Sequence, residues 1–283
     1  MSREALYVYA VLADPGDGAG PRGAGIDGAP LRLVRAAGCG LAALVHEAPA
    51  QPYQGPDDDV RRWIRAHDEA VENMRRAAGG VLPMTFNVLV APGPDGDAET
   101  RLRAWLRDRG DDLRRRLGRL RGRAEYRVEI TLDSAEVAAD DASVLEIEER
   151  MRDASPGLRR LLGKQLDAKR KAAADVLADE LHADARRRLS AVAEDLADRR
   201  RAVRGPGEID VLSLALLVHD DEVENLGLVL ADLQDAHHAV RVRFLGPWPP
   251  YSFTEDELTS PSPTPAQRPP LSGIDRSAGG PQA

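Results

Sequence analysis

Hydrophobic and polar positions follow two kinds of pattern along the chain, which predicts a mixed α+β protein. Leu6–Leu12 is apolar almost throughout, as in a strand covered on both faces, whereas apolar and polar residues alternate over Tyr126–Leu132, as in a strand with one exposed face. Further short apolar runs predict strands at Leu31–Val34, Leu41–Val45, Val81–Val90, Ile209–Val218 and Val240–Phe244.

Apolar residues at steps of three and four predict the helices between these strands. The clearest is Asp57–Ala78, whose apolar stripe begins at Val60 and includes His67. Three aspartates at its start suit a helix N-terminus, and Gly79–Gly80 supplies a stop. Two more helices are expected at Ala98–Leu120 and Asp220–Ala236.

A long helical arm is expected over residues 144–204, broken once at Ser155–Gly157. Beyond the break, apolar residues recur from Leu166 to Val203, and their spacing after Leu189 fits a coiled coil. A helix over Leu158–Arg204 would be roughly 70 Å long. One small domain cannot cover that length, so part of the arm should project as a hairpin or bind a partner.

These patterns predict two domains and a tail. Residues 1–134 are expected to form an N-terminal α+β domain that ends with the alternating strand. Residues 135–253 are expected to hold the arm and a small sheet. Residues 254–283 are rich in Pro, Ser, Thr and Gly, and this composition predicts disorder.

The most unusual stretch is the Pro-aromatic segment, residues 244–253. Only 4% of the chain is aromatic, yet this segment interleaves aromatic residues with three prolines. We expect a stiff, extended arm that either clamps the chain end onto its own domain or docks another protein. We expect Trp248 to pack inward, with Tyr251 or Phe253 nearer the surface. The candidate clamp or partner-binding residues are Trp248, Pro249, Pro250, Tyr251 and Phe253.

Composition and charge limit the classes of function that the protein can have. A net charge of −8 disfavours binding to nucleic acid or to an anionic membrane, so the runs Arg114–Arg116 and Arg199–Arg201 are interpreted as solvated helix faces. Cys39 is the only cysteine, which excludes an internal disulfide and a cysteine-based zinc site. The sequence shows neither a signal peptide nor a membrane span, and predicts a soluble intracellular protein.

Motifs for catalysis are weak. Gly18–Gly23 matches the dinucleotide pattern G-x-G-x-x-G, but the prolines and glycines around it predict a loop instead of the required helix. His67 is expected to pack in the core. His237 and His238 should point apart at a helix end, which disfavours a metal site. No catalytic, cofactor-binding or metal-binding residue is assigned.

Several segments together resemble the gas vesicle proteins of the GvpL/GvpF family. The most specific is Gly246–Phe253, and the others gain weight from their order along roughly residues 5 to 253. They are Leu6–Val11, Ile26–Gly28, Gly40–Val45, His67–Val71, Val81–Phe86 and Glu125–Val128.

The resemblance implies a non-enzymatic accessory protein of gas vesicles, the protein-shelled gas compartments that give cells buoyancy. It implies a ferredoxin-like N-terminal domain and a C-terminal domain that combines a ferredoxin-like element with long helices. The implied partners are the small hydrophobic shell protein and other accessory vesicle proteins in the cytoplasm, and the helical arm also offers a surface for self-association. The alternatives are a ferredoxin-like small-molecule-binding protein or enzyme, with a pocket near His67 and the Gly-rich loop, and a helical protein that binds nucleic acid.

Overall fold

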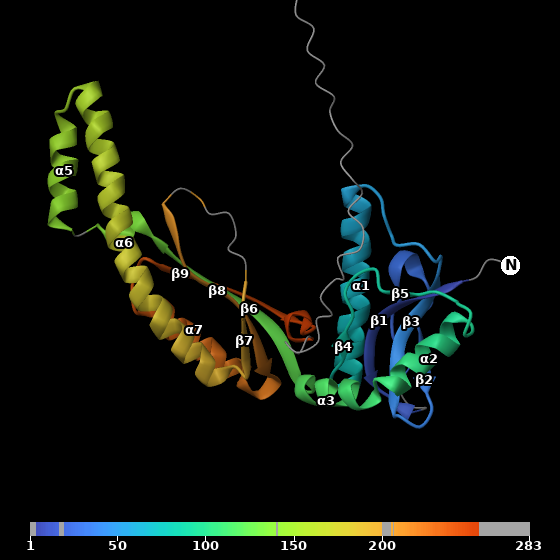
Figure 1. Cartoon of the computed structure of the whole chain (residues 1–283). Coiled ribbons are helices and arrows are strands. Elements are labelled where there is room, and N and C mark those ends of the chain that lie inside the picture. The colour runs from blue at the N-terminus through green and yellow to red at the C-terminus, as the bar shows by residue number, and fades with distance from the viewer. Residues whose placement is uncertain (1–3, 17–19, 140, 200–204, 206, 255–283) are drawn as a thin grey trace, which may run out of the picture.

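The computed structural model describes residues 4–16, 20–139, 141–199, 205 and 207–254. It contains two antiparallel sheets with helices packed on them and a helical hairpin that projects from one side (Figure 1). The first sheet has the order β2-β3-β1-β4, and β5 also pairs with β1. Its strands are β1 (Ala5–Ala13), β2 (Arg32–Ala36), β3 (Leu41–Ala48), β4 (Leu82–Pro83) and β5 (Leu89–Val90).

Helices cover both faces of the first sheet, which explains the unbroken apolar run in β1. Tyr7 and Tyr9 share one apolar cluster with residues of α1 (Asp57–Ala78). Val8 and Val11 share the other face because the register of β1 shifts between Val8 and Ala10, and they cluster with leucines of α2 (Ala98–Asp108) and α3 (Gly110–Leu120). Successive side chains of a strand point to opposite faces, so a strand between two helical layers needs apolar residues at every position.

The first sheet has the strand order of a ferredoxin-like fold. The described residues between β1 and β2 contain no α-helix where such a fold places its first helix, and they include a short 3-10 turn at Ile26–Gly28. The described part of the G-x-G-x-x-G stretch therefore opens no α-helix, although Gly18 and Ala19 lie outside the described residues. The loop interpretation holds where it can be checked.

We call the first sheet with α1, α2 and α3 the N-terminal half of the chain. Two elements predicted in this half are each divided in the structure. The strand expected at Val81–Val90 becomes β4 and β5, because Asn87 adopts a left-handed conformation with φ 72° and turns the chain between them. The helix expected at Ala98–Leu120 breaks at Arg109, whose backbone leaves the helical region. The break lets α3 follow a new direction, with Gly110 close to Cys39.

The second sheet has the order β7-β8-β6-β9, formed by β6 (Arg123–Asp133), β7 (Asp195–Asp198), β8 (Glu208–His219) and β9 (Val240–Trp248). The alternating strand that the sequence assigns to the N-terminal domain is β6, and it lies between β8 and β9. This corrects its placement: the strand follows α3 directly but finds both of its partners near the C-terminal end of the described residues. The domain boundaries as such stay a prediction.

Helices α6 (Pro156–Val192) and α7 (Val223–Asp235) pack on one face of the second sheet. The alternate β6 residues from Ala124 to Leu132 belong to this apolar cluster, as do Ala185 and Leu189 of α6. A 3-10 turn at Asp220–Glu222 precedes α7. The amphipathic pattern of β6 thus reflects one face against helices and the other against polar groups.

The first half of α6 extends beyond the sheet and pairs with α5 (Ala142–Arg152) (Figure 1). A small separate core holds the two together, formed by Ala138, Val144, Ile147, Leu162 and Leu166. We call α5 and residues 156–173 of α6 the helical hairpin. The short helix α4 (Ser134–Val137) connects it to β6. No helix of the described residues is both long and apolar enough to cross a bilayer.

The helix predicted to reach Arg204 ends at Val192, which corrects the far end of the coiled-coil pattern. The chain turns back at Ala193 and forms β7, where Leu196 pairs with Leu216 of β8. Leu196 still joins the helix-covered cluster, but it does so from a strand. Residues 200–204 and the tail from residue 255 onwards lie outside the described residues, so the expectation for the tail stays a prediction.

Stability should depend on the sheet-bound half of α6 and little on the exposed side of the hairpin. Leu189 is fully buried, so Leu189→Ala should lower the free energy of unfolding by about 3 kcal/mol. Leu161 is 56% exposed, so Leu161→Ala should change it by less than about 0.5 kcal/mol. Urea unfolding followed by circular dichroism measures both. Equal losses in the two variants would contradict the packing described.

Candidate functional site

The Pro-aromatic segment lies between the two sheets and is not a free extended arm. Its first half is part of β9, an edge strand, where a proline is tolerated because the outer backbone groups need no partner. Its second half is a 3-10 turn at Tyr251–Phe253. Gly246 is required where the segment passes β6, since a Cβ there would lie 2.8 Å from the ring of Tyr126. The expected stiff, extended arm is therefore corrected to an edge strand that ends in a tight turn.

A buried carboxylate holds the turn. Glu125 of β6 is 1% exposed, and its two oxygens accept hydrogen bonds from the backbone N–H and the hydroxyl of Ser252, at 2.8 and 3.0 Å. Arg199 lies 3.6 Å from the same carboxylate and donates to the Ser252 hydroxyl. Arg127 approaches it at 3.8 Å. A buried charge is costly unless it is paired and hydrogen-bonded, and here each oxygen has a partner.

Tyr251 connects the turn to the N-terminal half. Its hydroxyl donates to Asp68 Oδ1 of α1 at 2.9 Å, and its ring stacks on that of His67. Burial, together with the nearby Asp68 carboxylate, strongly raises the pKa of Tyr251. The phenol therefore keeps its proton and remains a donor at physiological pH.

Phe253 enters the apolar cluster between the two sheets. It is 6% exposed and belongs to the same cluster as Leu120 of α3 and Leu217 of β8. The carbonyl of the next residue, Thr254, accepts a hydrogen bond from Arg116 of α3. The side chain of Phe253 thus packs in a cluster to which both halves of the chain contribute.

Trp248 is only half-buried, and the Arg127 guanidinium lies 4.6 Å from its ring centroid. Pro249 and Pro250 are buried between Trp248 and the turn. The expected burial of these side chains is therefore reversed, because Phe253 packs inward and Trp248 lies nearer the surface. The reason is the turn after Pro250, which points the end of the segment back between the sheets.

A buried network of tyrosines and histidines lies beneath Tyr251. Tyr7 bonds His67 Nδ1 at 2.9 Å, while His67 Nε2 lies 3.0 Å from the Met84 carbonyl. Since a carbonyl only accepts, Nε2 carries the proton and Nδ1 accepts from Tyr7. The ring of His67 is 1% exposed, as expected for a core histidine. Both of its nitrogens are occupied, which leaves neither for a small molecule.

His46 is held in the same way as His67. Tyr9 bonds His46 Nδ1 at 2.9 Å, and Tyr53 lies 3.1 Å from its Nε2. Burial lowers the pKa of His46 to about 4 and also lowers the pKa of His67. Both rings are therefore neutral at physiological pH.

The remaining sequence candidates are not brought to this site. The rings of His237 and His238 stack with centroids 4.6 Å apart instead of pointing apart, and each bonds backbone groups nearby. Within the described ranges no group of three or more His, Cys, Asp or Glu side chains is placed to hold a metal ion. Cys39 is buried in the turn between β2 and β3, where its thiol bonds the Ala36 carbonyl.

Sequence reasoning missed three of the residues that receive the segment, namely Asp68, Glu125 and Arg127. It interpreted Arg199 as part of a solvated helix face, which is wrong, because Arg199 follows β7 and lies against Glu125. Asp68 and Glu125 are polar positions on amphipathic elements, where the default expectation is exposure. The only signal was that both lie within segments quoted for the family resemblance, His67–Val71 and Glu125–Val128.

Comparison with known proteins identifies relatives along nearly the whole chain. The family model for the gas vesicle synthesis protein GvpL/GvpF matches residues 5–255. Gas vesicle protein L2 of Halobacterium salinarum is 33% identical over 269 residues, covering 89% of this chain and 92% of that protein. Gas vesicle protein L of a Streptomyces species is 32% identical, covering 89% and 94%.

Solved structures share the fold. The crystal structure of the gas vesicle protein GvpF from Anabaena superimposes with a TM-score of 0.62 at 18% identity, covering 89% of this chain and 97% of that one. The GvpF structure from Microcystis aeruginosa gives 0.61 at 15% identity, covering 89% and 99%. At these identities the likeness concerns the fold alone.

The hydrogen bond between Tyr251 and Asp68 should stabilise the contact between the two halves of the chain. Tyr251→Phe keeps the ring and removes the donor, so it should lower the free energy of unfolding by about 2 kcal/mol, because the acceptor is charged and shielded. In a double-mutant cycle with Asp68→Ala, measured by urea unfolding, the two losses should be less than additive by about 1 kcal/mol. Strict additivity would show that the bond contributes nothing.

Stability should fall on acidification because His46 and His67 are held neutral. The unfolded histidines have a pKa of about 6.5, so below that value the unfolded state binds more protons than the folded state. The stabilisation is present above pH of about 6.5 and is lost as the pH falls. For His46 the loss continues to about pH 4, at about 1.4 kcal/mol per pH unit, and the loss from His67 has the same sign. Urea unfolding between pH 7 and 5 measures this slope.

His46→Asn removes one titrating ring and should flatten the slope. The matched control is His238→Asn, at an exposed histidine, which should leave it unchanged. An unchanged slope in His46→Asn would contradict the assignment.

Proposed function

Because this chain belongs to the GvpL/GvpF family of gas vesicle proteins, we propose that it is an accessory protein of gas vesicle assembly that acts through contacts with other vesicle proteins. The match over residues 5–255 is the observation that carries this proposal. Its proposed partners are the hydrophobic shell protein and other accessory vesicle proteins, and its proposed location is at the gas vesicle in the cytoplasm. It is proposed to need no catalytic residue or cofactor.

The helical hairpin is the proposed surface for the shell protein. It displays large apolar side chains to solvent, among them Leu145, Leu158 and Leu161. Other residues of the same helices already fill the hairpin's own core, so these leucines are not needed to hold it together. Exposed apolar groups gathered on a projecting element favour binding to an apolar partner. Self-association through the hairpin is the competing use of this surface.

The Pro-aromatic segment is proposed to serve as a clamp between the two halves of the chain. Tyr251, Ser252 and Phe253 each contact a different element, which supports this role. Trp248 lies nearer the surface and keeps an exposed edge for a partner. The alternative of a small-molecule site at His67 is disfavoured, since that ring is packed and both of its nitrogens are occupied.

Replacing the exposed leucines should weaken shell-protein binding without unfolding the protein. We expect Leu158→Gln with Leu161→Gln to reduce recovery of the shell protein in a pulldown at least fivefold, because about 2–3 kcal/mol of apolar burial would be lost. In a host from which the gene has been deleted, the wild-type gene should restore vesicles, seen as buoyancy and by electron microscopy, and the variant should not.

A matched control removes two exposed charges from the same helix by Lys164→Gln with Lys169→Gln. This variant should bind and complement like the wild type. Normal vesicles in the deletion strain would overturn the proposed function, whereas normal vesicles with the leucine variant would overturn only the assigned surface. Size-exclusion chromatography of both variants separates loss of self-association from loss of shell binding.

A further inference from the structure

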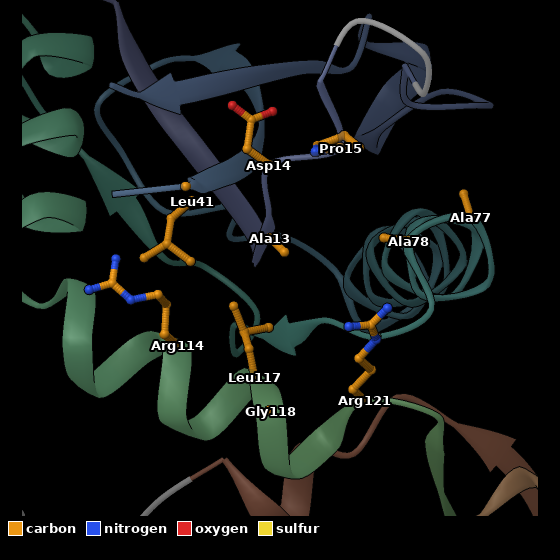
Figure 2. Close-up of a pocket in the computed structure, with 12 residues that line it drawn as sticks. Ala13, Asp14, Pro15, Leu41, Ala77, Ala78, Arg114, Leu117, Gly118 and Arg121 are labelled. Atoms are coloured by element: carbon orange, nitrogen blue, oxygen red, sulfur yellow. The ribbon is translucent and has the colours of Figure 1, made fainter. Parts of the chain in front are cut away.

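A cavity of about 440 Å³ opens between the C-terminal end of α1 and the side of α3 (Figure 2). It lies in the N-terminal half, away from the helical hairpin (Figure 1). Its volume falls in the range of small-ligand and side-chain pockets. The candidate clamp residues and the histidines singled out in the sequence do not line it.

The floor of the cavity is apolar. Ala78 of α1 and Leu117 of α3 border it, Leu41 of β3 is fully buried beneath it, and Ala13 lies at the end of β1. Gly118 of α3 lines the same space, and a Cβ added there would meet no atom within 4 Å. This surface can therefore receive an apolar group without any rearrangement of the backbone.

The rim is positively charged. Arg114 and Arg121 project from α3 and its end on either side of Leu117, towards the cavity (Figure 2). Arg114 donates to the Cys39 carbonyl and pairs with Asp111, so its position is fixed. Within the described part of the chain, the side chain of Arg121 has no hydrogen bond or ion pair.

The acidic residue of the rim is already neutralised. Asp14 pairs with Arg35 at 3.1 Å and accepts the Gly16 N–H at 3.0 Å. Two arginines line the cavity, and of these Arg114 already pairs with the exposed Asp111, so Arg121 is the rim arginine with no ion pair among the described residues. The net charge of the whole chain is −8. The cavity therefore combines an apolar floor with a locally basic rim on an acidic protein.

We propose that this cavity binds an acidic segment of a partner protein, with one apolar side chain inserted over Leu117 and carboxylates on Arg114 and Arg121. Residues seven apart on a helix are separated by about 10 Å along its axis, a distance that about three residues of extended peptide span. The fitting sequence therefore has acidic residues on both sides of an apolar one. Nucleic acid fits less well, since it offers no apolar side chain for the floor.

The test uses the full-length protein and a fluorescein-labelled peptide in which a leucine pair is flanked on each side by two glutamates. Fluorescence anisotropy should show saturable binding. Gly118→Phe fills the cavity and Arg121→Glu reverses the charge of its rim, so each should raise the Kd at least tenfold. Arg160→Glu makes the same charge change on the distant hairpin and should leave the Kd within twofold of wild type.

Two control peptides and one oligonucleotide make the outcome decisive. Peptides with lysines for the glutamates, or serines for the leucines, should bind at least tenfold more weakly. Equal binding of the lysine peptide, or unchanged binding to both cavity variants, would overturn the proposal. The proposal would also be overturned if a single-stranded DNA oligonucleotide bound with a Kd that Arg121→Glu raises and Gly118→Phe leaves unchanged. Urea unfolding confirms that each variant is folded, and pulldown of the shell protein reports separately on the hairpin.

Discussion

The arrangement of the two halves of the chain depends on the buried carboxylate of Glu125. A charge removed from water is tolerated only when its attraction to neighbours and its hydrogen bonds offset the desolvation cost. Ser252 supplies two of these bonds, and Arg127 and Arg199 supply positive charge. If the turn at residues 251–253 moved away, Glu125 would lose both hydrogen bonds from Ser252, while its own position in β6 would not change. This penalty fixes the turn in one position.

Fixing Ser252 also fixes its neighbours. Tyr251 is directed to Asp68 on α1, and Phe253 to the apolar cluster shared with α3 and β8. The ion pair of Arg119 with Asp195 links α3 to β7 along the same boundary. The boundary between the two halves is therefore held by directional polar contacts around the buried ring of Phe253. Such contacts specify a single relative orientation, which burial of apolar area alone does less well.

Local patterns predicted the elements better than their partners. Helix α1 has the bounds that its apolar stripe indicated, and β6 has the alternation expected of it. The same alternation could not show that β6 pairs with β8, because period-two patterning reports which face is covered and not by what. Leu189 and Leu196 keep helix-like spacing although the helix ends at Val192 between them, since a strand that packs on the same cluster also needs an apolar residue there. Within the site, the sequence identified the Pro-aromatic segment but not Glu125 or Asp68, which lie 127 and 183 residues from their partners.

The proposed binding surfaces lie on opposite sides of this boundary, which gives the proposed clamp a functional consequence. The helical hairpin continues from the second sheet, whereas the basic cavity is formed by α1 and α3 against the first. α3 borders the cavity through Leu117, and its Arg116 donates a hydrogen bond to Thr254, directly after the Pro-aromatic segment, so one helix borders both features. A partner bound in the cavity would meet a helix whose other side is already held by Thr254. Two partners would then be presented at a fixed separation, which is the geometric property that the proposed assembly role needs and that a flexible linker between the sheets could not supply.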